Sequence, residues 1–272
     1  MKIGVCIRAR DEQNTIMDWV THYLKLGFDR IIIYDNLSNM SVKQLLKNRN
    51  LLIDNKVFIY IDEFIGNGQH IIYQKCIDEN KDLDWLLLCD PDEFIYSKNN
   101  DIKDFLKNFS EDTATIIINW LVFGCSGNKQ FDHTKTLFEQ FTKREDYNHF
   151  WNRFVKSFIR PKLINKWCNV HLTFNLNYKI KDVYNKEINL YNTSPNGQFD
   201  NFDNNLSDNT PVVIVHYMTL DLESMQQKRQ RNMLYGIGVD INNPKYTLNW
   251  YYNNSLQGFK DNNQDLRMLK YV

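Results

Sequence analysis

The chain has 272 residues, of which 43% are hydrophobic and 14% aromatic, so it can bury the core of one large domain or of a domain with an appendage. Thirty-three basic and 33 acidic residues give a formal net charge of zero. A chain without net charge has no overall field that would hold a nucleic acid or an anionic membrane, which argues against both partner classes.

The first half of the chain alternates between short apolar runs and segments with helical periodicity. Residues 3–9 form a β-prone run, and residues 14–26 place apolar side chains on one helical face before Gly27, a residue typical of helix ends. The further predicted strands are 30–34, 57–61, 85–89 and 115–120, and the further predicted helices are 41–49, 69–80 and 101–108. This alternation predicts an α/β fold with a doubly wound, mostly parallel sheet.

The alternation ends after Gly127. Residues 128–210 mix basic and aromatic side chains, and they contain an Asn-, Asp- and Ser-rich passage at 192–209 that we expect to be a long loop. Residues 212–217 predict a strand that returns to the core, and residues 221–235 predict a charged helix.

The five cysteines, Cys6, Cys76, Cys89, Cys125 and Cys168, are widely spaced, and no two form a Cys-x-x-Cys pair. They indicate reduced thiols rather than a disulfide framework. No stretch approaches the roughly 20 apolar residues of a membrane span, and the charged residues from Arg8 to Glu12 interrupt the start too early for a signal peptide. We therefore expect a soluble protein of the cytoplasm.

A cluster of carboxylates follows the apolar run 85–89, in the order Asp90-Pro91-Asp92-Glu93. Ligands of α/β sheets bind beyond the carboxyl ends of the strands, where Asp90 and Asp92 could share one hard cation. Oxygen ligands suit Mg²⁺ or Mn²⁺ and would leave coordination positions for substrate phosphates. The alternative is a solvated acidic turn with Pro91 at its corner.

Two other predicted strands end in polar residues at the same edge of the sheet. Arg8 to Glu12 follow the first strand, and Asp35 and Asn36 follow the second. Together with the acidic motif they would line a crevice of the size of a nucleotide.

The order of these motifs resembles that of the GT-A glycosyltransferases, specifically the family 2-like and family 92 enzymes with a short Asp-x-Asp-Glu-Phe motif. The resemblance covers residues 3–232. Its motifs are Arg8-Ala9-Arg10-Asp11-Glu12, Trp19 with His22-Tyr23, Tyr34-Asp35-Asn36-Leu37-Ser38, Gln69 with Tyr73 and Cys76, Trp85 through Phe94, Asn119-Trp120, Lys156 with Arg160-Pro161, His171, and His216-Tyr217. Asp11 departs from the usual Asn of the first motif, and Met40 stands where Gly or Asp is common.

The resemblance implies a Rossmann-like GT-A domain over residues 1–235, with a nucleotide-sugar-binding half at 1–127, an acceptor-side half at 128–235 and a helical or irregular C-terminal extension at 236–272. It implies transfer of a hexose from a nucleotide sugar, taken to be a UDP-sugar, to a hydroxyl of a glycan or glycosylated acceptor. The likeness to family 92 implies inversion at the anomeric carbon.

The chemistry of this transfer assigns roles to the acidic motif. Breaking a sugar–phosphate bond builds negative charge on the leaving diphosphate, and a bound cation stabilises that charge. Asp90, Asp92 and the strand-end His216 are the predicted ligands of Mn²⁺ or Mg²⁺, and Asp92 and Glu93 are the predicted catalytic residues. His216 could equally be a core histidine.

Other residues are candidates for substrate contacts. Besides Asp90, the predicted donor-binding residues are Arg8, Glu12, Asp35, Asn36, Lys156, Arg160, Lys228 and Arg229. Trp120 could offer an aromatic face to an acceptor sugar. The structural alternatives are helix N-terminal charge for Glu12, solvated surface charge for the cations, and core packing for Trp120.

Inversion requires a carboxylate base near the acceptor hydroxyl, and the sequence does not single one out. Glu93 could instead hold the turn, and the later candidates are Asp132, Glu139, Glu145 and Asp146. Two other functions stay open. A metal-dependent nucleotidyl or phosphoryl transferase would need a further metal carboxylate or a Gly-rich phosphate loop, neither of which is evident. A catalytically silent module that binds a sugar nucleotide or a glycan is the other alternative.

Overall fold

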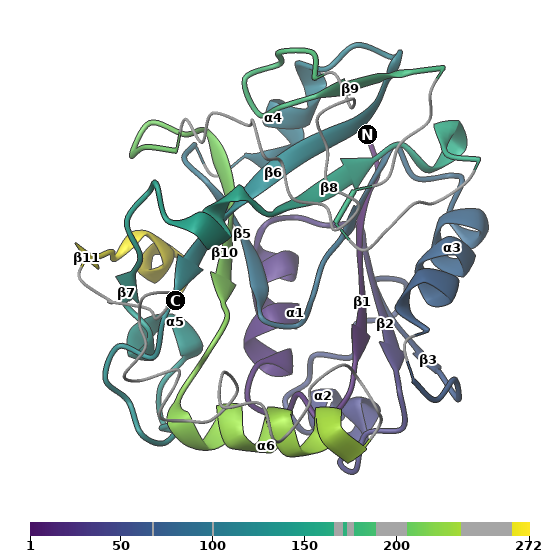
Figure 1. Ribbon diagram of the computed structural model, residues 1–272. Helices are drawn as coiled ribbons and strands as arrows, with labels where there is room; N and C mark the ends of the chain where they lie inside the picture. The colour runs from purple at the N-terminus through teal and green to yellow at the C-terminus, as the bar shows by residue number, and fades with distance from the viewer. Residues whose placement is uncertain (67, 100, 166–170, 173–176, 189–205, 235–262) are drawn as a thin grey trace.

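The computed structural model describes residues 1–66, 68–99, 101–165, 171–172, 177–188, 206–234 and 263–272 (Figure 1). Its first ten elements are β1 (Ile3–Ala9), α1 (Ile16–Lys25), β2 (Arg30–Asp35), α2 (Val42–Asn48), β3 (Val57–Ile61), α3 (Gln69–Glu79), β4 (Trp85–Leu88), β5 (Glu93–Ser97), α4 (Ile102–Lys107) and β6 (Thr113–Phe123). The later ones are α5 (Leu137–Gln140), β7 (Lys143–Arg144), β8 (Val155–Ile159), β9 (Lys179–Lys181), β10 (Val212–Tyr217), α6 (Leu222–Leu234) and β11 (Asn263–Gln264), with short 3₁₀ turns between them.

The N-terminal half forms the parallel part of the sheet. Strand β1 pairs in parallel with β2 and β4, and β2 pairs in parallel with β3. Helices α1 and α3 lie on opposite sides of these strands in Figure 1, and their buried residues belong to two separate core clusters. The strands are therefore apolar on both faces, as in parallel sheets covered by helices. The α/β class is confirmed, and the predicted elements of this half lie within a few residues of their observed bounds.

The sheet is wholly parallel from β3 to β4 and mixed beyond β4, so the expectation of a mostly parallel sheet describes only its first part. Strand β8 runs antiparallel between β4 and β6, and β10 pairs in parallel with β6 and antiparallel with β5. Neither β5 nor β8 was predicted. Strand β5 restarts directly after the acidic turn, and the apolar run of β8 is interrupted by Lys156 and Ser157.

Helix α6 crosses the carboxyl ends of the parallel strands at the bottom of Figure 1. It follows β10 and is held by two contacts with the N-terminal half. Ser224 accepts a hydrogen bond from Asn14 Nδ2 at 2.9 Å, and Lys228 Nζ lies 2.6 Å from Asp92 Oδ2. The edge of the sheet where polar residues gather is therefore covered by a helix from the C-terminal half.

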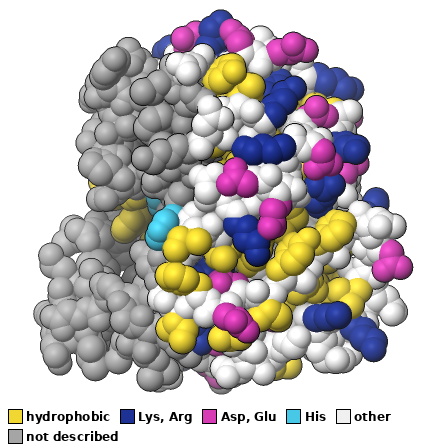
Figure 2. All heavy atoms as spheres, turned by 90° about the vertical axis from the view of Figure 1, so that its right-hand side faces the viewer, with side chains coloured by type: hydrophobic (Ala, Val, Ile, Leu, Met, Phe, Trp, Pro, Cys, Tyr) yellow, Lys and Arg dark blue, Asp and Glu magenta, His cyan; other side chains and the backbone are white. Residues whose placement is uncertain are grey.

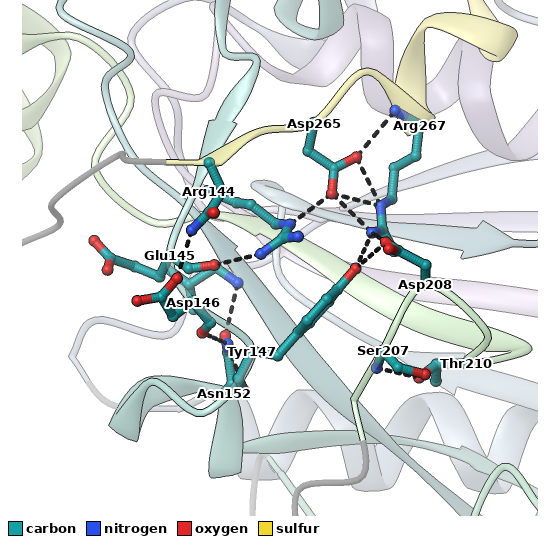
Figure 3. A network of polar contacts seen from close by, with 12 residues as sticks. Arg144, Glu145, Asp146, Tyr147, Asn152, Ser207, Asp208, Thr210, Asp265 and Arg267 are labelled. Carbon is teal, nitrogen blue, oxygen red and sulfur yellow. Dashed lines mark hydrogen bonds and ion pairs between the residues drawn. The ribbon is translucent and has the colours of Figure 1, made fainter.

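The described end of the chain packs on the main domain through the polar network of Figure 3. Asp265 accepts hydrogen bonds from Arg144 and Arg267, and Arg267 also donates to Tyr147, which donates to Asp208. Strand β11 adds backbone pairing with β7. Most of the predicted loop at 192–209, and residues 236–262 of the predicted extension, lie outside the described residues.

The surface on the right of Figure 1 carries Lys and Arg interspersed with Asp and Glu, among apolar side chains (Figure 2). Strand β3 forms this edge of the sheet, and exposed apolar residues include Ile61 and Ile65. No helix in the described part of the chain is both long and apolar enough to span a membrane. Cys6, Cys76, Cys89 and Cys125 are free thiols, and Cys168 lies outside the described residues.

Candidate active site

The acidic motif forms the turn that joins β4 to β5. The backbone N–H of Asp90 donates to Glu93 Oε2 at 2.8 Å, and the N–H of Glu93 donates to the carbonyl of Asp90 at 3.1 Å. Pro91 suits the corner of such a turn because its ring fixes φ and it needs no hydrogen-bond acceptor. The turn therefore presents Asp90 and Asp92 beyond the carboxyl end of β4, as the sequence predicts.

Asp90 is held from two sides. Gln69 on α3 donates to its Oδ1 at 2.7 Å, and Lys156 on β8 donates to its Oδ2 at 2.7 Å. Burial acts to raise the pKa of Asp90, but the charge of Lys156 outweighs burial and lowers it. The side chain retains 31% of its exposure, so an ionised carboxylate faces solvent at this edge.

Lys156 is completely buried, with its ammonium 2.7 Å from Asp90 and 3.5 Å from Glu93. Burial acts to lower the pKa of Lys156, but the two carboxylates raise it above its ordinary value. The lysine is therefore a charged group without solvent contact. The arrangement favours a role in holding Asp90 over the predicted direct contact with the donor.

Glu93 has no solvent exposure, so the prediction that it acts on the substrate as a catalytic residue is not supported by its position. Burial raises the pKa of its carboxyl to about 7, although Lys156 acts in the opposite direction. Its Oε2 accepts the N–H of Asp90, which fixes the turn. This contact agrees with the alternative interpretation of the sequence, that Glu93 holds the turn between the strands.

Asp92 lies beside the histidine predicted to join it. Its Oδ1 is 3.6 Å from His216 Nε2, and its Oδ2 is 2.6 Å from Lys228 Nζ. Strand β10 positions His216 because it pairs with β5 and places this residue opposite Glu93. Burial acts to raise the pKa of Asp92, but Lys228 and His216 outweigh burial and hold it well below its ordinary value.

Aromatic rings flank this pair. The rings of Trp120 and His216 are 4.3 Å apart between centroids, and Trp120 stacks on Phe154 at 5.2 Å. His171 lies 5.3 Å from Trp120, and burial together with the charge of Lys156 lowers its pKa to about 4. Trp120 is mostly buried, so it packs beside the site as well as bordering it. Phe154 was not predicted, because only its stacking on Trp120 connects it with the site.

The polar groups of Arg8 and Asn36 bind the loop that follows β3. The Arg8 guanidinium binds Asp62 at 2.6 Å and also the carbonyls of Phe64 and Gly66. Asn36 Nδ2 donates to the carbonyls of Asp62 and Phe64 at 2.8 and 2.9 Å. Both residues lie at the predicted edge, but their polar groups fix this loop and are not turned toward the acidic motif.

Asp35 and Glu12 remain near the predicted nucleotide side. Asp35 accepts the backbone N–H groups of Ser38 and Val42 at 3.0 and 3.1 Å, so it shapes the loop before α2. Glu12 lines a cavity of about 460 Å³ that Lys228 also lines. The cavity thus connects the end of β1 with the cation that pairs with Asp92.

Arg160 is not part of this site, and its prediction as a donor-binding residue is wrong. Because β8 runs antiparallel to β4, Ser157 lies opposite Leu88 and Arg160 lies toward the other end of the sheet. Its guanidinium stacks 4.0 Å over the Trp85 ring and donates to the carbonyl of Thr113. The side chain of Arg229 lies outside the described residues.

The side chains at this edge have ligand atoms that suit a divalent cation, although the described residues are not arranged as a complete metal site. Asp90, Asp92 and His216 supply the oxygen and nitrogen ligands that Mn²⁺ accepts, and the buried Nδ1 of His216 has no hydrogen-bond partner in the described structure. Within the described ranges, no three His, Cys, Asp or Glu side chains are grouped so as to hold a metal ion. The two aspartates are instead paired with Lys156 and Lys228.

Most of the other candidate bases take part in local structure. Asp132 accepts from Thr134, Glu139 completes a capping box with Thr136, and Asp146 accepts from Asn263. Glu145 is buried, with Oε2 3.9 Å from His149 Nε2.

The family model for glycosyltransferase family 92 matches residues 1–233. The chain belongs to glycosyltransferase family 92. A family 92 protein of rice, Oryza sativa subsp. japonica, is 23% identical over 107 residues. The matched stretch covers 39% of this chain and 18% of the rice protein, so the chain aligns with less than a fifth of that relative.

Solved structures also match this family 92 chain at low similarity. S. aureus TarS, residues 1–349, has 16% sequence identity and a TM-score of 0.38, with 60% of this chain and 48% of that chain covered. GalNAc-T7, crystallised with UDP, GalNAc and Mn²⁺, has 18% identity and a TM-score of 0.36, with 46% and 24% covered.

Proposed function

We propose that this family 92 chain is a metal-dependent glycosyltransferase. It transfers a hexose from a UDP-sugar to a hydroxyl of a glycan or glycosylated acceptor, with inversion. The observation that supports this function best is the meeting of Asp92, His216 and Lys228 beyond the carboxyl ends of the strands. A carboxylate and an imidazole as ligands, with one ammonium beside them at such an edge, suit a metal-bound diphosphate.

Asp90, Asp92 and His216 would hold Mn²⁺ or Mg²⁺, which when bound offsets the charge that develops on the leaving diphosphate. The other residues act around these three. Lys156 and Gln69 fix the orientation of Asp90 through its two oxygens. Lys228, with 41% of its side chain exposed, can exchange its contact with Asp92 for a phosphate oxygen.

The nucleoside would lie on the side of Glu12 and Asp35. Glu12 borders the cavity that reaches Lys228, so a base or ribose there would be connected with the diphosphate position. Asp35 shapes the adjoining loop with two backbone contacts and keeps acceptor capacity, since a carboxylate has about four lone-pair sites. Trp120 would border the acceptor sugar.

Membership of family 92 favours this function over a nucleotidyl or phosphoryl transferase. Hydrolysis of the donor distinguishes a transferase from a catalytically silent binding module. Purified protein should hydrolyse a UDP-sugar slowly without acceptor in the presence of Mn²⁺, and EDTA should stop this reaction. Asp92→Asn should abolish hydrolysis, whereas Asp54→Asn, at an exposed carboxylate outside the site, should not.

Binding is tested separately with a thermal-shift panel of nucleotides and sugar nucleotides with and without Mn²⁺. Because a ligand that binds only the folded state raises the melting temperature, UDP with Mn²⁺ should give a larger shift than UMP or adenine nucleotides. Full activity in chelator, or equal shifts for all nucleotides, would contradict the proposal.

A further inference from the structure

Strand β3 forms one edge of the sheet, at the right of Figure 1, and within the described residues it pairs only with β2. The N–H of Ile31 donates to the carbonyl of Lys56 at 2.7 Å, and the N–H of Asp62 donates to the carbonyl of Asp35 at 2.9 Å. Backbone groups alternate in direction along a strand. Every second residue from Lys56 to Asp62 therefore bonds to β2, and the residues between them turn their backbone groups outward.

The residues whose backbone turns outward are Val57, Ile59 and Ile61. The N–H of Val57 is used locally, because it donates to the carbonyl of Ile53 at 3.0 Å. The N–H groups of Ile59 and Ile61, and the carbonyls of all three residues, have no partner strand in the described structure. These donors and acceptors are thus available to a strand that is added at this edge.

The edge lacks the features that usually protect such a strand. Its sequence, Val-Phe-Ile-Tyr-Ile, contains no charge and no proline, and it pairs with β2 without a break in register. Natural edge strands carry charges, prolines or bulges because an unprotected edge pairs with other chains. An edge of this composition is therefore an expected site of contact with another strand.

Exposed apolar side chains surround this edge, on the face that Figure 2 shows. Ile61 is 62% exposed, and the loop that follows β3 adds Phe64 and Ile65, which are 43% and 70% exposed. Arg8 and Asn36 bind the backbone of this loop and hold it in place. Because the loop is fixed before any partner arrives, a contact here needs little ordering of the chain.

We propose that β3 is a self-association surface, to which a second copy of this chain adds its own β3 in antiparallel orientation. In the register centred on Ile59, all five residues of the strand are paired. Ile59 faces itself, and Val57 faces Ile61 of the second copy. Each Ile59 N–H then donates to the other Ile59 carbonyl, and each Ile61 N–H donates to the Val57 carbonyl of the other copy. Such a twofold contact uses the same surface on both copies and closes at two.

The charges at the two ends of the strand favour a second copy as the partner. Lys56 precedes the strand and Glu63 follows it, and both are exposed. Neither forms an ion pair within the ranges that the structure describes. The antiparallel register brings Lys56 of each copy opposite Asp62 and beside Glu63 of the other, whereas a parallel pairing in register would place Lys56 beside Lys56. Opposite charges across a strand pair stabilise it and like charges destabilise it, so the edge is complementary to itself in the antiparallel orientation.

This surface is separate from the candidate active site. Strands β1 and β2 lie between β3 and β4, the strand that leads to the acidic motif. Self-association can therefore be measured without donor, metal or acceptor, and its outcome does not depend on the proposed transferase function.

The test is the mass of the whole chain in solution, measured by sedimentation at about 1–100 µM. The wild type should form a dimer within this range. Ile61→Pro removes an outward N–H at a position where a strand edge tolerates proline, and Ile61→Lys places a charge in the pair with Val57. Each variant should raise the dissociation constant of the dimer about tenfold or more, while circular dichroism still shows a folded chain. Val272→Lys, at another exposed aliphatic residue, is the matched control and should dimerise as the wild type does.

Two further measurements report on the register. Lys56→Glu should weaken the dimer because it sets like charges opposite each other, and the added change Glu63→Lys should restore part of the affinity. In hydrogen exchange, the N–H groups of Ile59 and Ile61 should become protected as the protein concentration rises. The N–H of Tyr60, which points toward β2, should be protected at every concentration.

A monomer over the whole concentration range would overturn the proposal, as would a dimer that both Ile61 variants leave intact. Exchange at Ile59 and Ile61 that does not change with concentration would exclude β3 as the contact. Growth beyond a dimer would contradict the twofold pairing. Binding of an extended peptide at this edge by a chain that stays monomeric would assign the surface to another partner.

Discussion

Replacing Lys156 by Met tests how the acidic motif is held in place. The ammonium of Lys156 lies 2.7 Å from Asp90 and 3.5 Å from Glu93 and has no solvent exposure. Methionine fills a similar volume but leaves Asp90, and the buried Glu93 beside it, without their cation. Removing one partner of a buried ion pair costs about 3–5 kcal/mol, so the free energy of unfolding should fall by about 4 kcal/mol. For a chain of this size, the melting temperature should then fall by roughly 10 °C.

Urea denaturation of wild type and variants measures this loss. In the Lys156→Met background, Asp90→Asn should restore part of the stability, because it removes the carboxylate that is left charged without its cation. Lys103→Met is the matched control, since Lys103 pairs with Asp29 at the surface and such pairs contribute about 0–1 kcal/mol. A loss below about 1 kcal/mol in Lys156→Met, or no recovery in the double variant, would refute the account of Lys156 as a buried counter-ion.

Three further predictions concern other residues. His216→Ala should weaken Mn²⁺ binding and lower turnover together, and excess Mn²⁺ should restore part of the rate; a lower melting temperature with unchanged Mn²⁺ dependence would make His216 a core histidine. Asp35→Ala should lower stability by about 1 kcal/mol, because the N–H of Val42 loses its acceptor, and should weaken UDP binding. Unchanged calorimetric affinity in the folded variant would remove Asp35 from the nucleotide site. His22 should make the protein less stable in acid, because burial lowers its pKa to about 3 while its Nε2 contacts the carbonyl of Ile95. Protonation then favours the unfolded chain. The contribution of His22 to stability is therefore complete above about pH 6.5 and declines by about 1.4 kcal/mol per pH unit toward pH 3. Urea denaturation at pH 7 and at pH 5 should show a larger loss of stability in the wild type than in His22→Gln.

The parallel half of the fold could be predicted because its signals are local. The strand at residues 57–61 and the helix beginning at Gln69 are observed where the periodicity places them. Strand β8 could not be found this way. Its sequence contains a lysine that is stable in the core because Asp90, 66 residues earlier in the chain, and Glu93 lie beside it. A charge in an apolar run argues for the surface unless its partner is known.

The same difference between local and long-range signals decided which parts of the candidate site could be predicted. The proximity of Asp92 and His216 could be predicted because both residues end predicted strands. Arg160 was misplaced because its direction depends on β8 being antiparallel to β4. The contacts of Arg8 and Asn36 depend on the loop after β3, whose path no residue pattern indicated.

The position of β8 has a consequence for engineering this protein. The strand comes from the C-terminal half of the chain but pairs with β4 on one side and with β6 on the other. A fragment that stops at residue 127 would therefore leave β4 with an open edge and would lack Lys156, the cation of Asp90. The predicted nucleotide-sugar half is thus not an independent module. Chimaeras that exchange acceptor specificity must keep β8 with the acidic motif and replace segments on either side of it.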